Sequence, residues 1–328
     1  MAFAARRMVR GRVAVLMLHR FGEPGNGPGW PTPHQLRALL DYARRHRYRI
    51  VSLADLLHDD TPRSSGPAIA FTVDDGYADF AELALPVFQT FDCPVTLFVT
   101  TGFLDGTSWF WWDQLEYVLA RTERRAFTLT LGHGEETFEW DGAVRRTRTL
   151  GRIVARLKTL ANAERERAVA DIAEACRVDL PGTAPSAYAA LRWVDLRNAA
   201  GRGVSVGPHS VTHPILSACT DTQADWEIRE SWARVRSQVR SAVPVFCYPN
   251  GDSLSFGDRE VQALQRAGLE LGVSSMPGYA ASADLSRSAG PARRYTVPRF
   301  ACPSDLDGFV QIVSGIELFK SRFLALGR

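Results

Sequence analysis

Short apolar runs and longer stretches with helical periodicity alternate along most of this chain. The apolar runs are rich in valine, isoleucine and phenylalanine, so they predict strands at 13–18, 50–53, 68–73, 94–100, 204–206, 243–248, 271–274 and 295–298. The stretches between them predict helices at 33–46, with Thr32 as N-cap, and at 80–91, 221–241, 257–267 and 304–324. Seven or eight parallel strands separated by helices are typical of an α/β fold closed into a (β/α) barrel.

Residues 102–191 interrupt this alternation. The segment carries the aromatic run Trp109-Phe110-Trp111-Trp112, and its pattern then predicts a helix at 114–121, a hairpin of 127–131 with 137–140, and charged helices near 143–160 and 163–176. We interpret the chain as a single domain, 1–328, in which 102–191 is a mostly helical insertion that caps the mouth of the barrel.

Polar residues suited to metal chemistry follow two of the predicted strands. Asp74-Asp75-Gly76 comes directly after 68–73, and the string 209–214, His-Ser-Val-Thr-His-Pro, follows 204–206. One carboxylate and two imidazoles form a set of three ligands that leaves positions on a divalent metal for water. The second carboxylate is then available to take a proton from that water. The pattern predicts a metal-assisted hydrolase, although two histidines four apart are, by themselves, more often surface residues of a helix.

These two strings resemble the first two motifs of the polysaccharide deacetylases, the carbohydrate esterase family that shares the NodB homology domain. The family's first motif reads Thr-Phe-Asp-Asp-Gly, and here Val73 replaces the phenylalanine. A third string, 246–251, is similar to the loop that the family writes Tyr-Pro-Tyr-Gly or Arg-Pro-Pro-Tyr-Gly. In it Asn250 replaces the usual tyrosine, and Cys247 stands where some members have an arginine.

The resemblance implies a distorted (β/α)7 barrel of the NodB type as the catalytic domain, and it assigns roles to particular residues. It implies that Asp75, His209 and His213 bind the metal and that Asp74 is the catalytic base. It also implies that the backbone N–H of Asn250 donates to the developing oxyanion. A backbone donor survives the change from tyrosine to asparagine, whereas substrate packing against the usual ring does not.

A general acid is also needed, because the leaving amine must be protonated. Many members use a late histidine, but no histidine follows His213 in this chain. His19, at the end of the first predicted strand, resembles the N-terminal histidine that serves as the acid in the circularly permuted poly-N-acetylglucosamine deacetylases. Arg299 matches the late arginine that orients the catalytic aspartate in that branch. The alternatives are a histidine that caps a strand end and a surface arginine.

Aromatic residues near the motifs suggest where a sugar binds. We expect Tyr77, Tyr248 and Pro249 to line the pocket wall, and Trp109 and Trp111 to stack on sugar rings or to dip into a membrane interface. Packing within the insertion is an equally good interpretation for two of the tryptophans at 109, 111 and 112. Cys247 has no cysteine–histidine arrangement beside it, so we interpret it as a packing residue and not as a nucleophile.

Composition narrows the partners and the compartment. Five scattered cysteines without a Cys-x-x-Cys pair argue for reduced thiols, and a net charge of +3 without a basic, aromatic stripe argues against nucleic acid. Residues 1–12 contain no apolar signal-peptide core, and no run is long enough to span a membrane. We therefore expect a cytoplasmic protein, with association with the inner membrane face as an alternative.

The function expected from these features is metal-dependent de-N-acetylation of an amino sugar in a glycan or glycan precursor, including a lipid-linked saccharide. The resemblance implies a role in the biosynthesis of surface polysaccharide. Zinc suits the ligands best, and cobalt, nickel and iron suit them too. The alternatives are an amino-sugar deformylase or another linear C–N amide hydrolase on the same metal centre, and a non-catalytic carbohydrate-binding module on the same fold.

Overall fold

The protein is described by a computed structural model that covers residues 9–22, 30–57, 66–131, 134–285 and 290–318. Its chain divides into two compact units, one formed by 1–104 with 190–328 and the other by 105–189. That the predicted insertion caps the barrel mouth stays a prediction, and the two units are described separately below.

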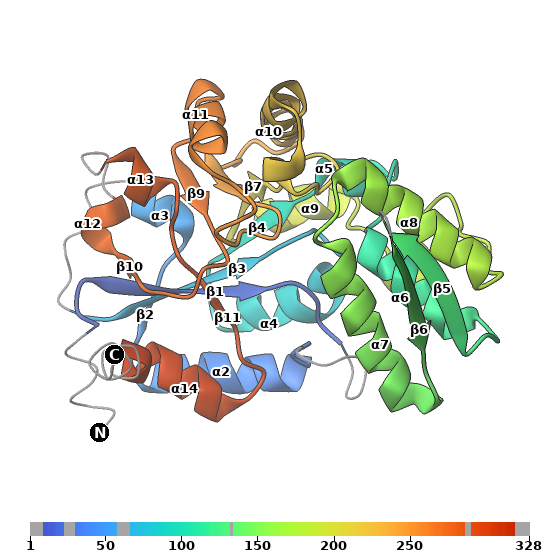
Figure 1. Ribbon diagram of the computed structural model, residues 1–328. Coiled ribbons are helices and arrows are strands. Elements are labelled where there is room, and N and C mark those ends of the chain that lie inside the picture. Colours follow the sequence, from blue (N-terminus) through green and yellow to red (C-terminus); the bar gives the residue numbers. More distant parts are fainter. Residues whose placement is uncertain (1–8, 23–29, 58–65, 132–133, 286–289, 319–328) are drawn as a thin grey trace, which may run out of the picture. The chain divides into compact units, whose positions relative to one another are not determined.

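The larger unit contains a ring of parallel strands with helices outside it (Figure 1). Its strands are β1 (Arg12–Leu18), β2 (Arg49–Ile50), β3 (Ala68–Val73), β4 (Val95–Val99), β7 (Val204–Pro208), β8 (Val245–Cys247), β9 (Leu271–Val273), β10 (Ala280–Ala281) and β11 (Phe300–Ala301). Its helices are α2 (Pro33–Arg45), α3 (Leu53–Leu57), η1 (Phe80–Ala84), α4 (Leu85–Thr90), α5 (Thr101–Leu104), α9 (Trp193–Ala200), η3 (Leu216–Ala218), α10 (Asp221–Gln238), α11 (Asp258–Arg266), α12 (Ser282–Leu285), α13 (Pro291–Arg294) and α14 (Leu306–Val313).

Backbone pairing closes this ring. β1, β3, β4 and β7 pair in parallel in that order. A parallel bridge between Val206 and Ala242 leads from β7 toward β8, β8 pairs with β9, and a bridge from Val273 to Val297 leads on to β11. β11 returns to β1 through the pair Leu16 and Phe300. The expected seven-stranded α/β barrel is therefore present, with 297–301 as its irregular seventh segment.

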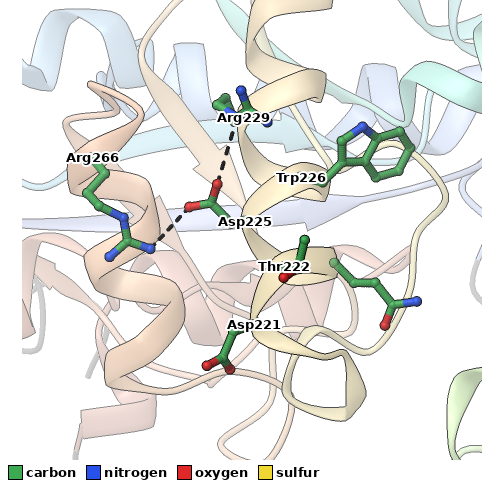
Figure 2. A pocket seen from close by; sticks show the side chains of 7 residues that line it. Asp221, Thr222, Asp225, Trp226, Arg229 and Arg266 are labelled. Carbon is green, nitrogen blue, oxygen red and sulfur yellow. Dashed lines mark hydrogen bonds and ion pairs between the residues drawn. The ribbon is translucent and has the colours of Figure 1, made fainter.

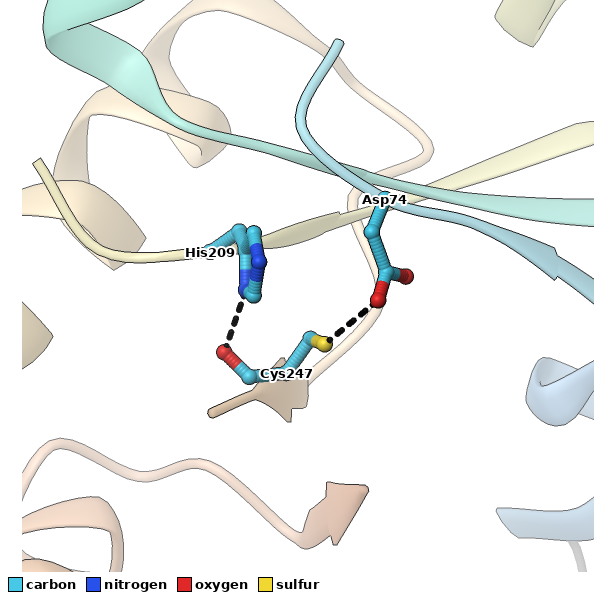
Figure 3. A group of neighbouring side chains, drawn as sticks. All are labelled: Asp74, His209 and Cys247. Carbon is cyan, nitrogen blue, oxygen red and sulfur yellow. Dashed lines mark hydrogen bonds between the residues drawn. The ribbon is translucent and has the colours of Figure 1, made fainter. Parts of the chain in front are cut away.

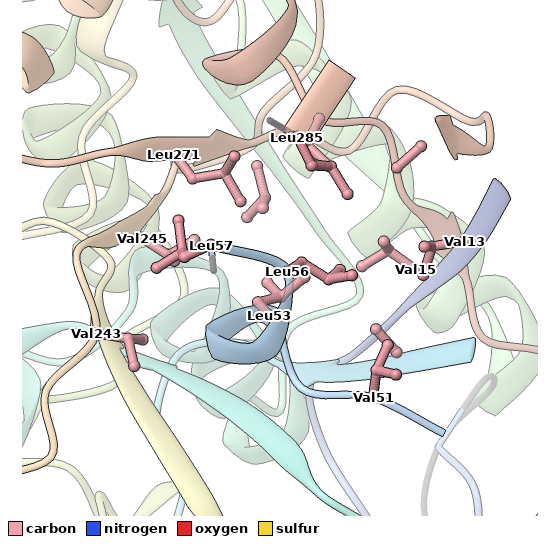
Figure 4. Packing of buried hydrophobic residues seen from close by; sticks show 14 of the residues in the cluster. Val13, Val15, Val51, Leu53, Leu56, Leu57, Val243, Val245, Leu271 and Leu285 are labelled. Carbon is pink, nitrogen blue, oxygen red and sulfur yellow. The ribbon is translucent and has the colours of Figure 1, made fainter. Parts of the chain in front are cut away.

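The barrel interior is filled by alternate residues of its strands. Val13 and Val15 of β1 belong to the same buried cluster as Val245 of β8 and Leu271 of β9 (Figure 4). This two-residue period is the one that places every second side chain inside a barrel. Leu53, Leu56 and Leu57 of α3 pack into the same cluster.

Local sequence explains where several elements begin. The side chain of Thr32 accepts the backbone N–H of Gln35 and Gln35 bonds back to Thr32, which confirms the predicted start of α2. Ser52 and Asp55 exchange the same pair of bonds. For this reason the predicted strand 50–53 is wrong beyond Ile50, and the chain turns into α3 instead.

Two other predicted elements differ in detail. The predicted helix 80–91 opens with the wide turn η1, in which the Leu85 N–H bonds to the Phe80 carbonyl. Pro86 follows, and its ring and missing N–H do not fit a regular α-helical turn at this point. The predicted strand 295–298 is reduced to the bridge at Val297. The last helix, α14, is shorter than predicted, and residues 319–324 of the prediction lie outside the described residues.

The smaller unit has a core of its own. It consists of α6 (Trp111–Arg121), the hairpin β5 (Ala126–Leu131) and β6 (Gly134–Glu139), α7 (Gly142–Leu157), α8 (Asn162–Ala175) and η2 (Ser186–Tyr188). The predicted hairpin is confirmed, with Phe127 opposite Phe138 across an antiparallel pair. Leu115, Phe138, Ile153 and Ile172 are fully buried in one cluster with Phe127, so the hairpin and the helices α6, α7 and α8 each contribute apolar side chains to this core.

Candidate active site

The strands β3 and β7 bring the two predicted motifs together. β3 is buried along its whole length, and the Asp74 N–H that follows it donates to the Leu18 carbonyl at 2.8 Å. Beyond β7, the His209 N–H donates to the Val99 carbonyl at 2.9 Å. Both motifs therefore begin at the carboxyl ends of barrel strands, where the backbone is still hydrogen-bonded to a neighbouring strand.

Asp75, His209 and His213 converge on one point. Nε2 of His209 lies 3.5 Å and Nε2 of His213 lies 3.6 Å from Oδ1 of Asp75, and the two Nε2 atoms are 3.1 Å apart. Tetrahedral zinc with bonds of about 2.0–2.2 Å separates its ligand atoms by about 3.3–3.6 Å. The three side chains, all buried, thus fit a divalent metal of this size.

Two further observations support a cation at this point. Oδ1 of Asp75 is buried and has no hydrogen-bond partner among the described residues, which is costly for a carboxylate unless a cation satisfies it. Nδ1 of His209 lies 2.7 Å from the Cys247 carbonyl, which can only accept, so Nδ1 carries the proton. The lone pair of this imidazole is then on Nε2, facing Asp75 and His213.

The pKa values of the two histidines shift in opposite directions. Burial, followed by the neighbouring His209, lowers the pKa of His213 to about 3. Burial also lowers the pKa of His209, but the contacts with Cys247, Asp75 and Asp74 outweigh it and leave this pKa well above the ordinary value. The neighbouring carboxylates thus favour positive charge between these ligands, which is the charge that a divalent cation would supply.

The backbone around these ligands is strained. Asp75, Ser210, His213 and Asn250 all have a positive φ, between 60° and 76°, which side chains other than glycine rarely adopt. Each such residue costs on the order of 1–3 kcal/mol, and such strain gathers at functional sites. The Ser210 hydroxyl partly compensates, because it accepts the backbone N–H of His213 at 3.0 Å.

Asp74 is held by a buried arginine. Nη1 and Nη2 of Arg299 donate to its two carboxylate oxygens at 2.8 Å each. The Cys247 thiol donates to Oδ2 at 3.4 Å, and Figure 3 shows Cys247 between Asp74 and His209. Burial alone would raise the pKa of Asp74, but the adjacent guanidinium outweighs burial and holds this pKa well below its usual range. Asp74 is therefore ionised at neutral pH.

His19 lies beside this carboxylate. Its Nε2 is 3.9 Å from Oδ2 of Asp74, and its side chain is 46% exposed, so it borders solvent while Asp74 does not. Asp79 fixes the segment after β1, because its carboxylate accepts Nε of Arg20 at 2.9 Å and the Phe21 N–H at 3.2 Å. The sequence prediction did not single out Asp79.

A second carboxylate that the sequence prediction missed is Glu227 of α10. It is buried and accepts the backbone N–H groups of Val211 and Thr212 at 2.7 and 3.0 Å. Val211 and Thr212 lie between the two histidines in the chain. Glu227 and Asp79 both lie among other charged residues, so nothing in the sequence pattern separates them from solvent-facing carboxylates.

The third motif forms a tight turn after β8. Asn250 and Gly251 both have positive φ, the Gly251 N–H donates to the Pro249 carbonyl at 2.7 Å, and the Ser275 hydroxyl donates to the Asn250 carbonyl at 2.6 Å. A Cβ on Gly251 would lie 2.8 Å from the Ser275 nitrogen, so only glycine fits there. The turn is fixed from both sides.

The residues predicted to contact sugar are mostly covered by protein. Tyr77 and Tyr248 are each 1% exposed, Tyr77 beside Arg20 and Tyr248 stacked on Phe256 with ring centroids 3.8 Å apart. Pro249 is buried as well. These rings support the site from within, so in this structure they do not form its open wall.

Within the smaller unit, the two tryptophans of the prediction have partners of their own. Trp109 is buried, packs against Tyr117 and Tyr188, and donates its indole N–H to the Pro181 carbonyl at 3.2 Å. Trp111 is partly buried, packs on the core of that unit and has the Arg165 guanidinium 5.3 Å from its ring. Both contribute to packing, and their contact with sugar stays a prediction.

A hollow with a volume of about 550 Å³ lies elsewhere, lined by residues of α10 and by Arg266 of α11. Figure 2 shows Asp225 directed at Arg229 and Arg266, at 3.7 and 3.1 Å. Its lining contains no histidine or cysteine, and the central carboxylate is already paired with two arginines. This hollow lacks the groups for metal chemistry, whereas the strand ends of the barrel have them.

Part of the chain is similar to a known protein family. The family model for polysaccharide deacetylase matches residues 158–272, a span that includes the second and third motifs, and confirms the resemblance seen in the motifs. No curated protein sequence matches the chain significantly. Among the described residues, no helix is long and apolar enough to cross a membrane.

Solved structures of deacetylases share the fold. The Streptococcus pyogenes deacetylase PplD, solved in complex with acetate, aligns with a TM-score of 0.59 at 16% identity over 92% of this chain and 98% of its own. The de-N-acetylase from Aggregatibacter actinomycetemcomitans aligns with 0.56 at 13% identity over 91% and 99%. IcaB from Ammonifex degensii aligns with 0.53 at 15% identity over 93% and 96%. The barrel is therefore of the NodB type found in these enzymes.

Proposed function

We propose that this protein is a metal-dependent de-N-acetylase, which hydrolyses the N-acetyl group of an amino sugar in a glycan or glycan precursor. The observation that carries the proposal is the pair of neighbouring carboxylates in different environments. Asp75 faces two imidazoles, and its Oδ1 has no hydrogen-bond partner in the part of the chain that the structure describes, whereas Asp74 is held by Arg299 on both oxygens. One carboxylate suits a metal and the other suits a proton transfer.

The residues divide the reaction among themselves. A divalent cation held by Asp75, His209 and His213 would supply a Lewis acid that polarises the acetamide carbonyl and lowers the pKa of water. Asp74, kept ionised by Arg299, accepts the proton of the attacking water. His19 borders solvent beside Asp74 and donates a proton to the nitrogen of the leaving amine.

The oxyanion needs a donor with a fixed direction. The backbone N–H of Asn250 is our candidate, because its turn is held on both sides by the bonds from Ser275 and to Pro249. A fixed donor costs no reorganisation during the reaction, which is the basis of this kind of stabilisation. The asparagine side chain is not required for this role.

Zinc is the metal we propose, since two imidazoles and one carboxylate at these separations suit tetrahedral zinc, with cobalt, nickel and iron as alternatives. We propose further that the protein acts in the cytoplasm, free or at the inner membrane face, on an oligosaccharide or lipid-linked saccharide destined for a surface polysaccharide.

The test joins metal content to product release. Purified wild type and Asp74→Asn are analysed for bound metal and for acetate released from N-acetylglucosamine oligomers. Stoichiometric metal in both, with acetate from wild type only, is the expected result. Metal without acetate would redirect the proposal to another acyl group, such as formyl. The absence of metal after reconstitution would overturn it and favour a carbohydrate-binding module.

A further inference from the structure

Glu227 accepts hydrogen bonds from the segment between the two histidine ligands. Its Oε2 accepts the N–H of Val211 at 2.7 Å and of Thr212 at 3.0 Å, and its Oε1 accepts the Thr212 hydroxyl at 2.5 Å. Three donors on one carboxylate leave it well satisfied, although only 4% of the residue is exposed. Hydrogen bonds to a charged group are stronger than those between neutral groups.

This segment, Val211 and Thr212, has a strained residue on either side. Ser210 before it has φ 64° and His213 after it has φ 60°, values that side chains other than glycine rarely adopt. Such a backbone persists only when its surroundings hold it. The carboxylate of Glu227 accepts the N–H groups of Val211 and Thr212, which lie between these two strained residues.

The helix that carries Glu227 is anchored independently of the metal site. α10 begins with a capping box between Thr220 and Gln223, and its inner face buries Ile228, Trp232 and Val235. The carboxylate is therefore attached to a rigid element, and the loop with the two histidines is held against it.

We propose that Glu227 is a positioning residue, which sets the separation of His209 and His213 and thereby the affinity of the site for a divalent cation. Its two oxygens are occupied by the loop, so it does not act as a ligand. This inference rests on the proposed function for its metal site, and it adds a determinant of metal affinity that lies on a helix outside the three motifs.

The main experiment measures zinc affinity without any substrate. Wild type, Glu227→Gln and the control Glu230→Gln, an exposed position on the same helix, are titrated with zinc in competition with a chromogenic chelator. Glutamine keeps the shape and can donate its NH₂ group to the Thr212 hydroxyl, but it removes the negative charge that strengthens the bonds from the two backbone N–H groups. Loss of such a supporting contact weakens metal binding by about 10–100-fold. We expect that loss for Glu227→Gln and wild-type affinity for Glu230→Gln.

A second variant covers the case in which Glu227→Gln does not fold. Thr212→Val removes the hydroxyl bond and leaves both backbone bonds in place, so we expect a smaller loss of zinc affinity, several-fold, in a folded protein. Acetate release at saturating zinc distinguishes weaker zinc binding from a general disruption of the active site. If a variant only binds zinc more weakly, added zinc restores its turnover to within a few-fold of wild type.

The outcomes are distinguishable. Equal zinc affinity in wild type, Glu227→Gln and Thr212→Val would overturn the role of Glu227 and leave the deacetylase proposal intact. Weaker zinc binding in the variants, together with no acetate release by wild type, would support Glu227 and overturn the proposed reaction. A wild-type protein that binds no zinc would overturn both.

Discussion

Asp74 and Arg299 form a bidentate ion pair across 225 positions of the chain, with both residues at most 2% exposed. Arg299 also donates to the Ser274 carbonyl and the Thr72 hydroxyl at 2.8 and 3.0 Å, so the guanidinium is fixed on several sides. A carboxylate held in this way is ionised and has one orientation. The barrel achieves this by placing the ends of β3 and the segment 297–301 in the same interior.

Replacement of Arg299 by alanine should change the pH dependence of catalysis. Asp74 would stay buried without its cation, so its pKa would rise. We expect the acidic limb of the kcat/KM profile to move to higher pH and the rate at neutral pH to fall by about 10²–10⁴-fold. Arg293→Ala, at an exposed position, serves as the control. An acidic limb that does not move would argue against the pairing as the source of the ionised base.

The same pair should link stability to pH. Since the pKa of Asp74 is lowered by folding, its contribution is present above the ordinary carboxyl pKa of about 3.9 and is lost as the pH falls through the lowered value. Removing one partner of a buried pair costs about 3–5 kcal/mol. Urea unfolding at pH 7 should show a loss of that size for Arg299→Ala, and a loss below about 1 kcal/mol would contradict it.

His19→Ala should slow the reaction without affecting the metal. A positioned general acid contributes about 10²–10⁴-fold, and we expect turnover to fall by that factor. Zinc content should stay at the wild-type level, because His19 is not among the converging ligands. His34→Ala, an exposed histidine on α2, is the matched control. Unchanged turnover in His19→Ala would assign the proton to another group.

Much of this site follows from the sequence because its parts occur at strand ends. Asp74, Asp75 and His209 follow buried apolar runs, and a barrel gathers such ends at one face. Glu227 could not be recognised in this way. It lies in a helix with acidic and basic residues on several faces, and only the packed structure shows which face is turned toward the histidine loop.

The buried tyrosines show a different limit. Tyr77 and Tyr248 lie next to the motifs in the chain, and this proximity favoured a role in the pocket wall. Both side chains are 1% exposed, Tyr77 beside Arg20 and Tyr248 against Phe256. Position along the sequence thus indicated the right region, but it did not determine the direction of each side chain.

Removal of the metal should destabilise the protein. A ligand that binds only the folded state stabilises it by about 2.7 kcal/mol when present at 100 times its Kd. Thermal unfolding of the chelator-treated protein should therefore occur at a lower temperature, and added zinc should restore it. His213→Gln should not retain the wild-type zinc content, and its Tm should not rise when zinc is added. A Tm that does not respond to zinc in wild type would contradict metal binding by this set.

Substitution of Cys247 tests whether the reaction depends on a nucleophilic thiol. It is fully buried, and burial raises the pKa of its thiol, so the reactive thiolate is scarce. Its contacts with Asp74 and Arg299 are those of a side chain that fills space beside an ion pair.

We therefore expect Cys247→Ala to keep its metal and to retain activity within about 10-fold of wild type, with a stability loss of about 1–3 kcal/mol. Cys93→Ala, another buried cysteine, controls for the loss of a packed thiol. Acetate release and zinc content are measured on the same preparations. The contrary result would be that Cys247→Ala retains zinc but releases no acetate, while Cys93→Ala stays active. It would indicate that the thiol of Cys247 takes part in the reaction and that Asp74 is not the only base in the active site.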